Sequence, residues 1–96
     1  MADLVAYNEG SVVSRQITKA DAGNVTLFAF DKDQELSEHT APYDALAHVL
    51  DGETEITISG KPFHLKAGDA IVMPAGEHHA VKALTRFKML LTMIRK

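Results

Sequence analysis

The chain has 96 residues, 46% of them apolar, a formal net charge of −3 and no cysteine. This length supplies one domain with a modest hydrophobic core. The composition excludes disulfides and thiolate metal sites, and the scattered lysines and arginines offer no basic patch for nucleic acid. No run of residues approaches the roughly 18 apolar positions that a membrane-spanning helix needs.

The N-terminal stretch MADLVAYNEG lacks the charged start and apolar core of a secretion signal. Together with the absence of cysteine, this favours a soluble protein of the cytoplasm that binds neither membrane nor nucleic acid. We expect residues 1–96 to form a single domain. Within it, residues 1–9 are expected to be either an extra edge strand or a loose arm.

A period of two between apolar and polar residues runs through most of the chain, which is typical of β-strands. The run VTLFAF, residues 25–30, predicts the first strand. The next apolar segment, residues 43–50, is too short for a helix and is followed at once by Asp-Gly, so we expect a strand there too. The alternating TEITISG, residues 54–60, predicts another.

The second half of the chain continues this pattern. Gly60 and Pro62 indicate a hairpin turn, because glycine accepts a positive φ and proline suits the start of a strand. Further strand patterns occupy residues 63–69, 70–76, 78–84 and 86–95. Turn signals about every eight to twelve residues favour an all-β fold, a sandwich or a small antiparallel barrel.

The segment GDAIVMPAGEHHAVKA contains Gly68, Pro74, Gly76 and His79 at fixed spacings. Pro74 ends a strand because it cannot donate to a ladder, and Gly76 permits a tight corner. The spacing resembles the second motif of the cupin superfamily, G-x5-P-x-G-x2-H-x3-N. The match is complete except at the last position, where Ala83 stands in place of asparagine.

The segment SEHTAPYDALAHVLDG is similar to the first cupin motif, G-x5-H-x-H-x3,4-E-x6-G. When its last glycine is placed on Gly52, His39 falls at the first histidine, Ala41 at the second and Ala45 at the glutamate. The two segments cover the central half of the chain. The chain therefore resembles the small single-domain (type 2) cupins, and the resemblance implies an all-β, small antiparallel barrel or jelly roll.

Cupins usually hold a divalent metal on three histidines and a glutamate, and they include oxygenases, isomerases and ligand-sensing domains. The resemblance implies that His39 and His79 are metal ligands, and imidazole suits a divalent transition metal such as Zn, Fe, Ni, Mn or Cu. The alternative is two polar residues that line a solvent-filled barrel mouth. A third ligand could come from Asp44 or Glu38 if a bulge turned it inward, although a surface carboxylate is the competing interpretation.

Tyr43 shares strand parity with Ala41 and Ala45, and the motif alignment implies that this parity faces the barrel interior. The phenol could bond a ligand or simply pack at the rim. Alanine in place of two ligands predicts a roomier, apolar small-molecule pocket, with Met89 in its wall. Two further methionines, Met73 and Met93, belong to the same prediction, and the alternative is that all three are core.

The other histidines, His48, His64 and His78, have the opposite parity and are expected to point outward. We therefore predict a small-molecule-binding cupin with a partial, open divalent-metal site, in which a metal-dependent oxygenase or isomerase activity is left open. The alternative is a metal-free ligand-binding or sensing module without catalysis. A plain interaction protein is a third interpretation. A homodimer is expected, because a short domain with many strand edges must cover them.

Overall fold

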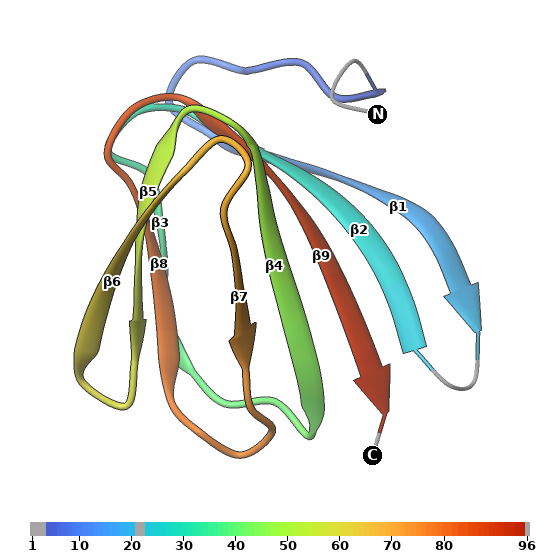
Figure 1. The fold of residues 1–96 in the computed structure, drawn as a ribbon. Helices are drawn as coiled ribbons and strands as arrows, with labels where there is room; N and C mark the ends of the chain where they lie inside the picture. Colours follow the sequence, from blue (N-terminus) through green and yellow to red (C-terminus); the bar gives the residue numbers. More distant parts are fainter. Residues whose placement is uncertain (1–3, 21–22, 96) are drawn as a thin grey trace.

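In a computed structural model, the protein is described over residues 4–20 and 23–95. Nine antiparallel strands and no α-helix are found in these residues (Figure 1). The strands are β1 (Val12–Ala20), β2 (Gly23–Phe30), β3 (Glu35–His39), β4 (Tyr43–Asp51), β5 (Glu53–Ile58), β6 (Lys61–Lys66), β7 (Ala70–Met73), β8 (His79–Ala83) and β9 (Phe87–Arg95).

The strands form two facing sheets, one of five strands in the order β1-β2-β9-β4-β7 and one of four in the order β3-β8-β5-β6. Chain neighbours often lie in different sheets, so the two layers are woven into a jelly-roll barrel (Figure 1). This confirms the predicted all-β antiparallel barrel. No helix in the described part of the chain is long and apolar enough to cross a membrane.

Two strands lie where the sequence pattern gave no expectation. β1 is an edge strand with β2 as its neighbour, and its middle carries the polar run Ser14, Arg15 and Gln16. β3 is almost wholly exposed and pairs with β8. An edge strand buries less of its surface than a central strand does. Apolar and polar residues therefore alternate less regularly along it.

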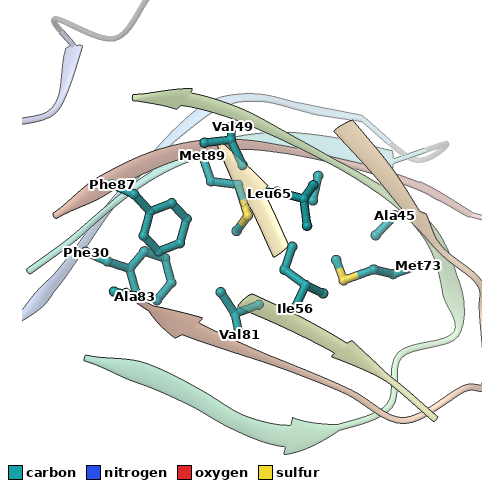
Figure 2. Close-up of a cluster of buried hydrophobic side chains, with 11 residues drawn as sticks. Phe30, Ala45, Val49, Ile56, Leu65, Met73, Val81, Ala83, Phe87 and Met89 are labelled. Atoms are coloured by element: carbon teal, nitrogen blue, oxygen red, sulfur yellow. The ribbon is translucent and has the colours of Figure 1, made fainter. Parts of the chain in front are cut away.

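The core lies between the two sheets and is built from the inward parity of each strand (Figure 2). On β4 the buried positions are Ala45, Ala47 and Val49, while Leu46 and His48 face outward. The rings of Phe30 and Phe87 stack with centroids 4.5 Å apart. Alternation with a period of two therefore places these residues as the strand pattern predicts.

The N-terminal segment, residues 4–11, packs across one end of the barrel and contains no strand. Val5 is buried against Leu27 and Ala29 on the outer face of the five-stranded sheet. The Tyr7 hydroxyl donates a 2.5 Å hydrogen bond to Asp51. Of the segment 1–9 singled out in the sequence, residues 1–3 lie outside the described residues.

The barrel thus has two different ends. The clasped end carries the N-terminal segment together with the loops 31–34 and 84–86, and the histidine end carries the loops 40–42 and 74–78 (Figure 1). At the clasped end Gly52 has φ +76°, and a Cβ there would collide with the carbonyl oxygen of Arg86. Because the loop at Gly52 lies so close to the loop at Arg86, only glycine, which has no Cβ, fits at this position.

Candidate functional site

The two motif histidines meet at the histidine end of the barrel. His39 is the last residue of β3, His79 is the first residue of β8, and the two are register partners. Their Nε2 atoms lie 3.1 Å apart, with ring centroids 4.3 Å apart and planes at 71°. His79 has Ile58 of β5 on its other side. Residues forty positions apart in the sequence therefore form one pair.

A bulge in β3 brings His39 to the inner face. Leu36 pairs with Val81 and His39 pairs with His79, so two residues of β3 lie opposite a single residue of β8. Because Leu36 and His39 are three positions apart, regular alternation without a bulge would put them on opposite faces. No pattern in the sequence indicated this bulge. Because β3 is exposed along most of its length, it has no apolar alternation in which an extra residue would be noticed.

A backbone carbonyl fixes the tautomer of His39. Its Nδ1 lies 2.7 Å from the carbonyl oxygen of Ser37, which can only accept a hydrogen bond. In the neutral ring Nδ1 therefore carries the proton, and Nε2 presents a lone pair toward His79. The sequence did not indicate this contact. A carbonyl bonded to the remote ring nitrogen is the usual way in which a metal-binding histidine is oriented.

The two rings differ in burial and therefore in basicity. His79 is 6% exposed and its Nδ1 has no hydrogen-bond partner in the described residues, whereas His39 is exposed. Desolvation, followed by the charge of His39, lowers the pKa of His79, and the Glu77 backbone partly opposes this shift. His79 is therefore held neutral, which is the form that binds a metal.

The spacing of the pair fits two adjacent positions on one metal ion. At bond lengths of about 2.0–2.1 Å, two imidazole nitrogens on one ion lie about 2.9–3.4 Å apart. The observed 3.1 Å falls within that range. It also fits an N–H···N hydrogen bond from His79 to His39, so the same geometry serves the metal-free state.

No group of three or more His, Cys, Asp or Glu side chains able to hold a metal occurs among the described residues. The two predicted candidates for a third ligand are not brought to the pair. Asp44 accepts a 2.9 Å hydrogen bond from the Ala75 N–H, and Glu38 lies 3.8 Å from His78. Any ion held by His39 and His79 would therefore keep most of its positions for water or a ligand.

The predicted pocket residues fall into two groups. Ala45 is buried and lies in register between Met73 of β7 and Met93 of β9. Tyr43 and Ala41 are half-buried at the start of β4 and just before it. By contrast, Met89 lies two residues from Phe87 and is fully buried in the core (Figure 2).

The histidines expected to point outward are not part of the pair. His64 is exposed and bonded to Glu53 at 2.9 Å, His78 is exposed, and His48 is half-buried on the outer face of β4. A hollow of about 340 Å³ lies on the outside of the four-stranded sheet, where Glu35, Glu55 and Lys82 line it. It is on the far side of that sheet from the paired imidazoles.

Three solved structures share the fold of this chain. A cupin 2 conserved barrel domain protein from Leptotrichia buccalis is 41% identical with a TM-score of 0.96, over 99% of this chain and 46% of that one. A cupin superfamily protein from Desulfitobacterium hafniense is 30% identical with a TM-score of 0.96, over 100% and 88%. A conserved protein of unknown function from Streptococcus pyogenes is 36% identical with a TM-score of 0.89, over 93% and 78%.

Sequence comparison agrees with the structural one. An uncharacterized protein from Aquifex aeolicus (strain VF5) is 30% identical over 93 residues, which is 95% of this chain and 77% of that protein. The family model described as "Cupin domain" matches residues 26–94, which include both motif segments and the paired histidines. The chain therefore belongs to the cupin family.

Proposed function

We propose that this cupin binds a small molecule at an open divalent-metal site whose protein ligands are His39 and His79. The observation that carries the proposal is the 3.1 Å separation of the two Nε2 atoms. It is supported by the Ser37 carbonyl, which leaves the Nε2 lone pair of His39 free. Imidazole ligands suit Zn, Fe, Ni or Cu, and a Mn ion would draw more on oxygen ligands.

A bound ion would polarise an oxygen of the small molecule. Side chains and backbone of the protein would hold the ion and orient the small molecule. His79 stays neutral because it is buried, Ser37 orients His39, and the half-buried Tyr43 carries a phenol that can donate a hydrogen bond near the mouth. Met73 and Met93 are the register neighbours of Ala45, and their flexible side chains can adapt to an apolar ligand. An oxygenase or isomerase activity would rest on this arrangement.

Metal content tests the proposal directly. Protein purified without chelator should contain close to one divalent ion per chain by elemental analysis. His39→Ala and His79→Ala should each abolish that content, because one imidazole alone holds an ion weakly. His78→Ala changes an exposed neighbour and should leave the content intact. Full occupancy that survives both substitutions in the pair would rule the site out.

A metal-free binding module is the second candidate, and a specific observation favours it. The pair can be joined by its own N–H···N hydrogen bond, and the positions of two motif ligands are taken by alanine. This alternative predicts no stoichiometric metal and a rise in melting temperature with an organic ligand. That rise should persist in the presence of a strong chelator, whereas a metal-dependent ligand would lose its effect.

We also infer a homodimer formed through the outer face of the five-stranded sheet. Leu46, Val72 and Ile94 are 42%, 56% and 58% exposed and lie on the adjacent strands β4, β7 and β9. Between Asp44 and Lys88 the outward positions of β4 and β9 are uncharged, which suits a self-complementary apolar contact better than a charged partner. Sedimentation should give twice the monomer mass, and Val72→Lys should give the monomer.

A further inference from the structure

His48 lies in the middle of the apolar outer face through which we infer the homodimer. Its register partners are Leu90 of β9 and Ala70 of β7, and Leu46 is the neighbouring outward residue of its own strand. The ring is half-buried, and within residues 4–20 and 23–95 no hydrogen bond or ion pair joins it to another group. A titratable side chain therefore stands among apolar ones without a partner.

The charged and titratable groups beside this face stand away from the His48 ring. They are Asp44 and Asp51 of β4, Lys88 of β9, Asp69 before β7 and Tyr7 of the N-terminal segment. One end of the face holds Asp44, and the groups from β9 and the N-terminal segment gather with Asp51 at the other end. Asp69 turns away, because its carboxylate accepts the Lys66 N–H. Among the described residues, no carboxylate is thus placed to balance a charge on His48.

The charges at the ends of the face favour one orientation of the second copy. With a two-fold axis parallel to the strands, the Asp44 ends of both copies would meet and repel. An axis perpendicular to the strands reverses the second copy and brings its Asp44 toward the end that carries Lys88. The middle rows of the face then exchange, so His48 of one copy lies opposite Leu46 and Thr92 of the other.

We propose that protonation of His48 separates the two copies, so that the homodimer forms near neutral pH and dissociates in mild acid. This inference rests on the homodimer proposed above and adds its regulation. In the monomer a protonated ring on this face is in contact with water. In the dimer the same charge is held against apolar side chains without a carboxylate, which is costly. Because imidazole gains its proton between pH 8 and 5, the dimer binds fewer protons than two monomers and weakens as the pH falls.

Sedimentation equilibrium of the full chain at pH 7.5 and 5.5, at constant ionic strength, tests the inference. The dissociation constant of the dimer should rise by about tenfold or more, with a limit of about a hundredfold per pH unit because two protons are linked to each dimer. His48→Gln keeps a neutral polar side chain and should dimerise equally at both pH values. His48→Lys carries a permanent charge and should be monomeric already at pH 7.5. Circular dichroism at each pH checks that the compared chains are folded.

Two exposed histidines outside the face provide matched controls. His64→Gln and His78→Gln should keep the wild-type response to pH. If His48→Gln fails to fold, His48→Leu takes its place and should dimerise at both pH values. A wild-type dimer of equal strength at pH 7.5 and 5.5, or an unchanged pH response in the folded neutral variant, overturns the inference and leaves the homodimer intact. A monomer at both pH values overturns the homodimer itself, and the inference falls with it.

Discussion

The two ends of the barrel contain different kinds of side chain. The clasped end contains the stacked Phe30 and Phe87, both fully buried, and the N-terminal segment held by Tyr7 and Asp51. Toward the histidine end the core contains Ala45 and Met73 (Figure 2), and the paired imidazoles lie at the ends of β3 and β8. Large rigid side chains concentrate packing energy, while small and flexible ones leave room for a ligand. We infer that this barrel separates stability from binding along its long axis.

The largest effect is expected at the clasped end. Phe87→Ala should lower the free energy of unfolding by about 3–5 kcal/mol, because it removes a ring and leaves a cavity beside Phe30. Urea denaturation measures this loss. The matched truncation at the other end, Met73→Ala, removes a smaller and more flexible side chain and should cost less, about 2–3 kcal/mol. A loss at Met73 as large as the loss at Phe87 would contradict the division between the ends.

Two glycines with similar backbone angles should respond differently. Gly52 at the clasped end and Gly60 in the β5–β6 hairpin have φ values of +76° and +83°. A Cβ at Gly60 would meet open space. Gly60→Ala should therefore lower the free energy of unfolding only by the strain of a left-handed alanine, roughly 1–2 kcal/mol. Gly52→Ala adds a collision with Arg86 and should cost about 1–3 kcal/mol more. Equal melting temperatures of the two variants would show that the Arg86 loop yields freely.

The two ends should lose stability in different pH windows. The folded pKa of His79 lies below its unfolded value of 6.5, so its contribution is present above pH 6.5 and is lost as the pH falls through the folded value. The Gly10 N–H and the Arg86 guanidinium lower the pKa of Asp31 at the clasped end from 3.8 to about 2, so its contribution is lost between those values. Urea midpoints measured from pH 7.5 to 5 should fall in the wild type and fall less in His79→Gln.

The smallest effect is expected from the clasp itself. Tyr7→Phe removes the hydrogen bond to Asp51 and keeps the ring beneath Arg86 and Lys88. Because this bond is at the surface, its loss should cost about 0.5–1 kcal/mol. Tyr7→Leu, which also removes the cation–π contacts, should cost more. If Phe and Leu at this position behave alike in thermal unfolding, the ring contacts contribute nothing.

Strand alternation was enough to predict an all-β fold and most of its strands, because buried strands carry a regular pattern with a period of two. The motif alignment then indicated which parity of β4 faces inward, and with it Ala45 was placed inside and His48 outside. The pairing of His39 with His79 could be anticipated only through the family resemblance, since no local pattern joins residues so far apart. The Ser37 carbonyl and the separation of Met89 from the mouth depend on backbone geometry, and side-chain identity does not encode them.

The bulge of β3 lets the strand carry one residue more than regular pairing with β8 needs while the two imidazoles still meet. Deletion of one residue from the Ser37–Glu38 pair would leave Leu36 and His39 two positions apart, so regular alternation would keep the His39 ring on the inner face without a bulge. A relative that lacked this single residue would therefore keep the pair on a regular strand. In this fold the spacing between the inward leucine and the motif histidine can change by one residue without moving the histidine to the other face.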